Sequence, residues 1–281
     1  MKYLAASIAL LTLTACEQQP AGEPVARARI DGKTQPAPSP SPTPTETPTI
    51  ASQVESACRS IIFEDTPLTH CLAIPSRHRI AMELGPDGEA PYRSLGALAK
   101  RRNARTIAFA MNGGMFDDEG KPIGYYVENS QRRKALNTAD GAGNFHLKPN
   151  GVFFGSGDKW EVRATEDFLK NVTERPEFGT QSGPMLVIDG KIHPEITQNG
   201  PSRLIRNAVG VDDKGRAHFV ITNAPLSFGR LARFYRDELN VKNALFLDGS
   251  VSSLWNPSTD RLDTGAPIGP IIVVERRSQS Q

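Results

Sequence analysis

The sequence predicts an α+β fold in which a large mixed or antiparallel sheet carries a few helices within a single domain. Many short apolar runs are bounded by Gly, Pro, Asn or Asp, which is typical of strands. Only three segments favour helix, residues 92–102, 165–171 and 227–239. The 281 residues carry a formal net charge of only +2. The chain therefore lacks the strongly basic composition of a nucleic-acid-binding protein.

The N-terminus is typical of an exported bacterial lipoprotein, with residues 1–15 as its signal peptide. A basic end is followed by an apolar core, residues 4–13, that is too short to cross a bilayer. The core ends in LTAC, which resembles the lipobox, and the resemblance implies that Cys16 is lipidated, with palmitate among its acyl chains. An ordinary signal peptide that is removed together with Cys16 is the alternative. Glu17, in place of aspartate, favours the outer membrane facing the periplasm.

Residues 16–50 predict a disordered tether. They contain almost no apolar side chains, and proline stands at nearly every second position from Pro36 to Pro48. Such a segment buries too little surface to fold and favours extended polyproline II. At about 3.1 Å per residue its reach is on the order of 100 Å. We expect it to hold the folded domain, residues 51–281, away from the membrane.

Cys58 and Cys71 are the only cysteines beyond the signal region. In an oxidising compartment such a pair is most simply a disulfide, whereas a catalytic thiol would need a reducing one. The bridge would close a loop of about 14 residues and contribute roughly 3 kcal/mol in the chain-entropy model. We expect it to close a hairpin of residues 60–64 and 71–74 around Asp65-Thr66-Pro67.

The remaining elements follow from local patterns. Ser227 is expected to cap the clearest helix, Thr165 to cap a shorter one, and residues 100–102 to form a solvated basic last turn of the first helix. The long Gly- and Asn-rich connection 136–151 is a candidate functional loop. Strands are expected at residues 77–83, 107–111, 123–127, 152–154, 160–163, 185–188, 208–211, 217–221 and, as the last buried strand, 243–247. Hairpins are expected between 152–154 and 160–163, between 208–211 and 217–221, and at the Asp-Gly turn after 185–188, which a polar turn in TQSG (180–183) precedes.

Three apolar strands are interrupted by polar residues and glycine. They belong to the segments AFAMNGG (108–114), TQSGPMLV (180–187) and LFLDGSVSS (246–253), and RLIRN (203–207) precedes a fourth strand. Buried strands that release polar groups at one end can build a pocket, so we expect these ends to converge. Taken singly, each motif is more often a turn or a surface charge.

Together and in this order, the motifs resemble the phosphodiester glycosidase family. The residues that carry the resemblance are NGGMF (112–116), SGPMLV (182–187), RNAVGV (206–211) and FLDGSVSS (246–253), with LKPNGVFF (147–154) similar to the bacterial, exopolysaccharide-biosynthesis-type branch. The resemblance covers roughly residues 55–275. It implies a hydrolase that cleaves a sugar-1-phosphodiester (glycosyl phosphodiester) linkage in an envelope or extracellular glycan. Ser250-Val251 depart from the family, whose last motif commonly has glycines there.

The chemistry of such a linkage suggests roles for these residues. A phosphate monoester is a good leaving group, so the substrate needs less help from a protonated acid than an ordinary glycoside. It needs donors on the phosphate oxygens and a carboxylate or activated water at the anomeric carbon. We therefore predict Asp248 as general base or oxocarbenium-stabilising carboxylate, and Arg206 as a bidentate phosphate ligand.

The other predicted site residues bind the substrate. The N–H groups of Gly113 and Gly114 are expected to assist Arg206 on the phosphate, and Asn112 and Ser182 to orient the substrate by hydrogen bonds. The set is completed by Lys148, Asn150, Gly183 and Gly249.

No cofactor is certain from the sequence. A divalent cation such as calcium is left open, with Asp117 and Asp118 as its carboxylates. His146 and His193 have no partner at ligand spacing, which indicates ordinary surface histidines.

Two rival functions stay open. One is a non-catalytic glycan-binding lipoprotein in exopolysaccharide or envelope assembly, which the lost glycines favour. The other is a phosphodiesterase that cuts the phosphorus–oxygen bond. The aromatic residues fall mostly within strand or helix patterns, which favours the enzyme over a binding module. The expected partners are the carbohydrate phosphodiester and, through the N-terminal lipid, a membrane.

Overall fold

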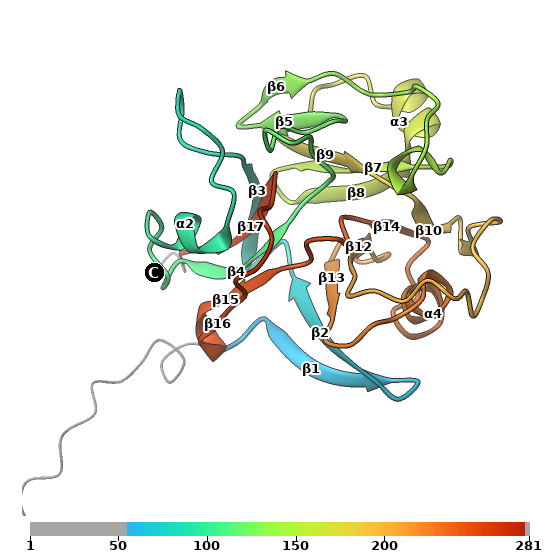
Figure 1. The fold of residues 1–281 in the computed structure, drawn as a ribbon. Coiled ribbons are helices and arrows are strands. Elements are labelled where there is room, and N and C mark those ends of the chain that lie inside the picture. The colour runs from blue at the N-terminus through green and yellow to red at the C-terminus, as the bar shows by residue number, and fades with distance from the viewer. Residues whose placement is uncertain (1–54, 279–281) are drawn as a thin grey trace, which may run out of the picture. The chain divides into compact units, whose positions relative to one another are not determined.

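The computed structural model describes residues 55–278 (Figure 1). The predicted signal peptide, Cys16 and the tether lie outside these residues. The described part contains three sheets, of seven, five and five strands, and a few short helices. The expectation of one large sheet is therefore wrong, although the prediction of antiparallel strands with few helices in a single domain is confirmed. No helix in this part of the chain is both long and apolar enough to cross a membrane.

The seven-stranded sheet begins with the β1–β2 hairpin. Its strand order is β1 (Cys58–Phe63), β2 (Thr66–Ala73), β13 (Ala217–Thr222), β12 (Asn207–Val211), β14 (Asn243–Phe246), β10 (Met185–Ile188) and β11 (Lys191–Ile192). The predicted hairpins of β12 with β13 and of β10 with β11 are confirmed. Both are joined by short Asp- and Gly-containing turns, which explains why they could be predicted locally.

The disulfide is present where the sequence predicted it. Cys58 and Cys71 lie opposite each other in the β1–β2 register and are joined with an S–S distance of 2.01 Å. The hairpin turn, however, is Glu64-Asp65, with φ of 43° and 61°, and not Asp65-Thr66-Pro67. Pro67 instead lies inside β2, opposite Ile62.

A second sheet is built around β4, the strand that ends in Asn-Gly-Gly. Its order is β16 (Arg261–Leu262), β15 (Leu254–Asn256), β4 (Ile107–Asn112), β17 (Ile271–Arg276) and β3 (His78–Glu83). Residues 243–247 are therefore not the last buried strand, because β17 follows them and lies between β3 and β4. The apolar run 271–274 is typical of a strand buried on both faces, and the sequence analysis missed it.

The third sheet surrounds β9. Its order is β6 (Gln131–Lys134), β5 (Tyr126–Glu128), β9 (Phe178–Ser182), β7 (Gly151–Ser156) and β8 (Lys159–Ala164). The pairing of β7 with β8 is confirmed. Residues 180–182, interpreted as part of a polar turn, instead belong to the buried central strand β9. The polar side chains in this strand are retained because they bond to neighbouring segments.

The described part of the chain has three short α-helices, and only the first of them is clearly shorter than predicted. They are α2 (Leu95–Ala99), α3 (Thr165–Asn171) and α4 (Phe228–Arg233), which continues as a π-helical turn (Phe234–Glu238), and there are 3-10 turns at Asn144–His146 and Pro257–Thr259. The Ser227 cap is confirmed, since its hydroxyl accepts a hydrogen bond from Arg230 N. Thr165 is the first residue of its helix and not its cap.

One core joins the three sheets. The ring of Phe219, from β13, lies 5.3 Å from that of Phe109 in β4 and 5.6 Å from that of Phe153 in β7. These rings belong to one buried cluster. A separate cluster, which includes Leu231 and Phe246, packs α4 against the seven-stranded sheet. The motif-bearing strands therefore belong to a single packed unit.

Candidate active site

The predicted convergence of strand ends occurs around two asparagines. Asn112 is the last residue of β4, and Asn207 is the first residue of β12. Asn207 Nδ2 donates to Asn112 O at 3.0 Å and to Asn112 Oδ1 at 2.9 Å. The backbone N–H of Asp248, two residues beyond β14, donates to Asn207 Oδ1 at 3.0 Å. We call Asn112 and Asn207 the asparagine pair.

The asparagine pair also holds the loop 248–253. Asn112 Nδ2 donates to Asp248 O at 3.3 Å, and Asn112 Oδ1 accepts from Ser253 N at 2.9 Å. The hydroxyl of Ser252 donates to Asp248 O at 3.1 Å. Both amide atoms of Asn112 are thus occupied inside the protein, and its expected role in orienting substrate is replaced by a role in fixing the loop.

Three other predicted donors are also engaged. Ser182, fully buried, donates its hydroxyl hydrogen to Leu247 O. The N–H of Gly113 donates to Pro270 O at 2.7 Å, and that of Gly114 donates to Thr180 Oγ1 at 3.0 Å. The expectation that these two N–H groups bind phosphate is therefore wrong.

Asp248 is the carboxyl group at this junction. Its exposed fraction is 9%. Burial raises the pKa of Asp248 to about 6, and the hydrogen bond that Ser250 N donates to Oδ1, at 3.1 Å, only partly opposes the shift. Within residues 55–278 no cation lies within ion-pair distance of Asp248. A carboxyl with such a pKa can exchange protons near neutral pH.

A cleft of about 630 Å³ is lined by Gly249, Ser250 and Ser252, which follow Asp248 in sequence, together with Thr222 and Arg261. The side chain of Asp248 is not part of this lining. This volume is in the range of small-molecule sites. At Gly249 a Cβ atom would lie 2.8 Å from the ring of Phe246, so the position favours glycine. Of the predicted site residues, Gly249 therefore lines this cleft, and Asp248 is buried directly before it in the chain.

Arg206 is adjacent to Asn207 in sequence but its side chain packs into the layer of α4. It is fully buried, with the guanidinium carbon 3.7 Å from the ring centroid of Phe228 and 5.6 Å from that of Phe246. Nε donates to Leu226 O at 2.8 Å, and Nη2 donates to Ser202 O and Oγ, both at 3.1 Å. Burial lowers the pKa of Arg206 to about 10.

The remaining nitrogen of Arg206, Nη1, is buried and has no hydrogen-bond partner among the described residues. To bind two phosphate oxygens, Arg206 would also have to use Nη2, and Nη2 would first have to give up its hydrogen bonds to Ser202. Buried donors without a partner are rare in folded proteins.

The residues predicted from the long loop 136–151 stabilise that loop. Lys148 Nζ forms an ion pair with Asp140 at 2.6 Å. Asn150 Nδ2 donates to Phe145 O at 2.8 Å, and a Cβ atom at Gly183 would lie 2.7 Å from Asn150 Cβ. Lys148 and Asn150 therefore have partners within the protein and Gly183 packs against Asn150, while their contacts with substrate stay predictions.

The predicted cation ligands and histidines also have local roles. Asp117 Oδ1 accepts from Glu119 N at 3.1 Å and Lys121 N at 2.9 Å, which closes a turn. In the described range there is no group of three or more His, Cys, Asp or Glu suited to a metal ion. His146 Nδ1 lies 3.1 Å from Ala139 O. His193 is buried, so its interpretation as a surface residue is wrong.

Sequence reasoning missed two polar residues that organise the site. Asn207 lies inside the motif RNAVGV, and a polar residue opening an apolar strand was its signal. Gln181 precedes Ser182 in a segment that was interpreted as a turn. Its Oε1 accepts from Tyr125 N at 2.8 Å and Asn137 N at 2.9 Å. Gln181 Nε2 donates to Asn137 O at 2.7 Å, which fastens the long loop to β9.

Comparisons with known proteins relate this arrangement to one family. A family model described as phosphodiester glycosidase matches residues 105–275. The chain is 36% identical over 182 residues to the uncharacterized protein YigE of Escherichia coli (strain K12), covering 64% of this chain and 71% of that protein.

The fold is similar to a solved catalytic domain. This is the zebrafish N-acetylglucosamine-1-phosphodiester α-N-acetylglucosaminidase catalytic domain, auto-inhibited by its pro-peptide. The TM-score is 0.54 at 16% identity, over 78% of this chain and 82% of that chain. A hypothetical protein from Synechocystis aligns with a TM-score of 0.48 at 15% identity, over 78% of this chain and 61% of that chain.

Proposed function

Because this chain belongs to the phosphodiester glycosidase family, we propose that it hydrolyses a sugar-1-phosphodiester linkage in an envelope or extracellular glycan. The observation that carries the proposal is the position of Asp248, a buried carboxyl with a raised pKa, directly before the residues 249–253 that line a cleft of about 630 Å³. The asparagine pair holds the backbone of Asp248 in place by hydrogen bonds. A catalytic group that is already held in place loses less conformational entropy when the substrate binds.

The reaction breaks the bond between the anomeric carbon and the phosphate oxygen. The phosphate monoester leaves with the bonding electron pair, and a water molecule supplies the hydroxyl group to the anomeric carbon. The Asp248 carboxylate either accepts the proton of that water or first stabilises the positive charge on the sugar ring. A phosphate monoester leaves readily, so one carboxylate suffices where ordinary glycosidases use two.

Arg206 is proposed as the phosphate-binding cation, acting first through Nη1. A phosphate oxygen at this nitrogen would satisfy the buried donor and offset the cost of burying the guanidinium charge. Arg206→Lys removes the planar arrangement of donors. We expect it to raise the KM for the phosphodiester at least tenfold, measured by steady-state kinetics. A KM equal to that of the unaltered protein would remove Arg206 from the site.

Hydrolysis in ¹⁸O-labelled water tests the bond that is cleaved, with synthetic sugar-1-phosphodiesters as substrates. We expect the label in the released sugar. Label in the phosphate would instead identify a phosphodiesterase that cuts the phosphorus–oxygen bond. Asp248→Asn should lower kcat by at least a hundredfold, since removal of a positioned base typically costs that much.

The second candidate function is non-catalytic glycan binding during exopolysaccharide or envelope assembly. It is favoured by Ser250 and Val251, whose side chains stand where the family commonly has glycines, and both residues line the cleft. Saturable binding of a phosphodiester glycan without turnover by the full chain would select this function over hydrolysis.

We further propose that the protein acts as a lipoprotein, anchored through Cys16 in the outer membrane and facing the periplasm. The lipobox-like segment supports the anchor. The Cys58–Cys71 disulfide is consistent with export, because disulfides persist in oxidising compartments.

A further inference from the structure

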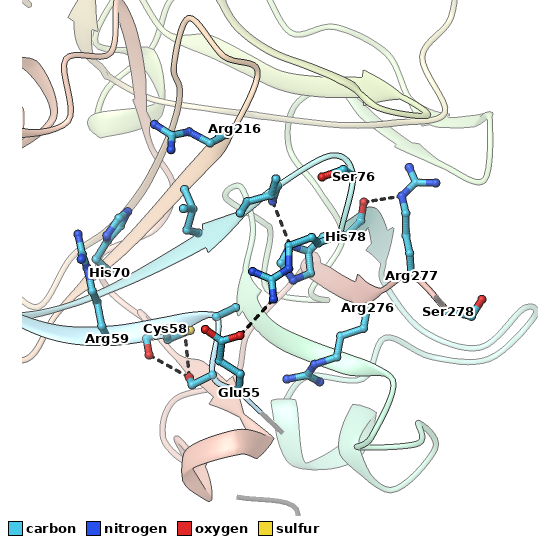
Figure 2. A pocket seen from close by; sticks show the side chains of 15 residues that line it. Glu55, Cys58, Arg59, His70, Ser76, His78, Arg216, Arg276, Arg277 and Ser278 are labelled. Carbon is cyan, nitrogen blue, oxygen red and sulfur yellow. Dashed lines mark hydrogen bonds and ion pairs between the residues drawn. The ribbon is translucent and has the colours of Figure 1, made fainter. Parts of the chain in front are cut away.

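A second and larger cavity, of about 680 Å³, lies where the β1–β2 hairpin meets β3 and the end of β17 (Figure 2). It shares no lining residue with the cleft that residues 249–253 line. Strand β13 lies between the two, because Arg216, directly before this strand, lines the cavity and Thr222, its last residue, lines the cleft. At about 3.3 Å per residue, this stretch of strand separates them by roughly 20 Å. We call the larger cavity the basic pocket.

The basic pocket is strongly cationic. Its charged lining comprises five arginines and one glutamate: Arg59, Arg77, Arg216, Arg276, Arg277 and Glu55. Two of the arginines are neutralised, Arg77 by Glu55 at 3.1 Å and Arg216 by Asp212 at 2.6 Å.

The other three arginines keep their charge uncompensated. Between residues 55 and 278, no carboxylate lies within ion-pair distance of Arg59, Arg276 or Arg277. Arg276 Nη2 donates to Ser258 Oγ at 2.7 Å, and its Nη1 donates to the carbonyl oxygens of Ile107 and Arg105. Arg277 Nε donates to His78 O at 3.0 Å and its Nη2 to Gly157 O at 3.5 Å, so among the described residues neutral partners hold both side chains and leave Arg276 Nε and Arg277 Nη1 as their remaining donors. Figure 2 shows Arg59 on one side of the pocket, with Arg276 and Arg277 on the other.

A chain of buried side chains ends at this pocket. His218 Nε2 lies 3.1 Å from Asp212 Oδ2, and His218 Nδ1 lies 3.0 Å from Nε2 of His70, which lines the pocket. Burial raises the pKa of Asp212, but hydrogen bonds from Arg216 and His218 outweigh burial and lower this pKa to about 2. Asp212 is therefore ionised and can only accept hydrogen bonds.

The ionised carboxylate fixes the proton positions along this chain. Burial lowers the pKa of His218, and burial together with the charges of His218, Arg59 and Arg216 lowers the pKa of His70 to about 3. Both rings are thus neutral at pH 7. His218 must donate from Nε2 to Asp212 and accept at Nδ1 from His70 Nε2, which leaves His70 Nδ1 as a hydrogen-bond acceptor.

From this geometry we propose that the basic pocket is a second ligand site that binds a sugar phosphate. Arg59, Arg276 and Arg277 bind the phosphate, and His70 accepts a hydrogen bond from a sugar hydroxyl. Guanidinium groups match the oxygen geometry of phosphate, while a neutral acceptor requires a ligand that also carries a donor. The cavity volume suits a ligand of this size. The site needs no turnover at Asp248 and is independent of the proposed hydrolysis.

Isothermal titration calorimetry on the full chain tests the phosphate part. The probes are glucose 1-phosphate, inorganic phosphate and glucose. Arg59 is exposed, so Arg59→Glu is expected to fold and to weaken binding of glucose 1-phosphate at least tenfold. Arg236→Gln, whose side chain pairs with the neighbouring Asp237, is the control and should bind as the unaltered protein does. Equal affinity in both variants, or no binding by the unaltered protein, would overturn the proposal.

The same titrations test the hydroxyl part. Glucose 1-phosphate should bind at least tenfold more tightly than inorganic phosphate, and His70→Gln should reduce this ratio. Equal affinities for the two probes in the unaltered protein would contradict the role of His70, whether or not His70→Gln folds. Measurable binding of glucose with the same affinity as glucose 1-phosphate would exclude a phosphate site.

Discussion

Asp248 is the residue whose environment decides most about the proposed chemistry. It is buried without a neighbouring cation in the described part of the chain, so its carboxyl holds a proton up to a pKa of about 6. If the ionised form is the active base, kcat/KM for a sugar-1-phosphodiester should rise with pH through about 6. A rate that falls over that interval would instead make Asp248 a general acid.

The same shift predicts a pH-dependent stability. A folded-state pKa of about 6, above the ordinary 3.8, means that the ionised form is less stable in the folded protein. The protonated Asp248 carboxyl therefore contributes to the free energy of unfolding below pH 3.8, and this contribution is lost as pH rises through 6. At about 1.4 kcal/mol per pKa unit, it amounts to roughly 3 kcal/mol in total. Asp248→Asn should therefore be the more stable protein at pH 7.5 and lose this advantage at pH 4. Urea unfolding at pH 7.5 and pH 4 measures the free energy of unfolding of both proteins. The same difference between the two proteins at both pH values would argue against the raised pKa.

Asn112 should be a structural residue. Asn112→Ala removes the acceptor for Ser253 N, one of the two acceptors for Asn207 Nδ2 and one of the two donors to Asp248 O. Because each buried group left unpaired costs about 1–3 kcal/mol, we expect a loss of roughly 3 kcal/mol in the free energy of unfolding.

The control for Asn112→Ala is Asn171→Ala, at the exposed end of α3. It should change the free energy of unfolding by less than about 0.5 kcal/mol. Similar losses in the two variants would mean that the asparagine pair does not hold the site.

The sequence could supply the residues of the site but not all of their partners. Asp248 and Gly249 were predictable because a polar turn after a buried strand is a local pattern. The use of Asn112, Gly113 and Gly114 was not predictable, because their partners Asn207, Pro270 and Thr180 come from distant segments, and Asn207 and Thr180 lie in strands of other sheets. An N–H group that looks free in the sequence can be satisfied by a strand far along the chain.

At the scale of elements, local signals predicted hairpins and failed for strands with distant partners. The β7–β8 and β12–β13 hairpins were found because both strands and their turn lie within about a dozen residues. The division into three sheets depends on which distant strands pair, as when β17 inserts between β3 and β4. Strand periodicity carries no information about that choice.

Close packing between two sheets gives a prediction at this scale. Gly114→Ala would place a Cβ atom 2.2 Å from Gln181 O and 2.7 Å from Thr180 Oγ1. Because β9 would have to move, we expect a loss of about 1–3 kcal/mol or more in the free energy of unfolding. Thermal and urea unfolding measure it.

Gly96→Ala is the matched control. It lies inside α2, and the nearest atom to a new Cβ, apart from its own helix and neighbours, is Ser94 Oγ at 3.9 Å. It should raise the free energy of unfolding by about 0.5–1 kcal/mol, because alanine has a higher helix propensity than glycine. Destabilisation of both variants to the same degree would refute the packing argument.

At the scale of the whole molecule, we predict that the protein is attached to a membrane through Cys16. Cys16→Ser removes the acceptor for the lipid, and a protein without a lipid chain loses about 0.8 kcal/mol of membrane affinity per buried methylene. We expect the variant to move from the membrane fraction to the soluble periplasmic fraction, followed by immunoblotting. An unchanged membrane fraction would mean that something other than Cys16 anchors the chain.

The position of the disulfide has a mechanical consequence. Cys58 is the first residue of β1, which is an edge strand, and its partner Cys71 lies in β2. Tension applied from the N-terminal side reaches this covalent cross-link before it reaches the hydrogen bonds of β1. The load therefore passes directly into β2, and the hairpin cannot be peeled open from that end while the cross-link is intact.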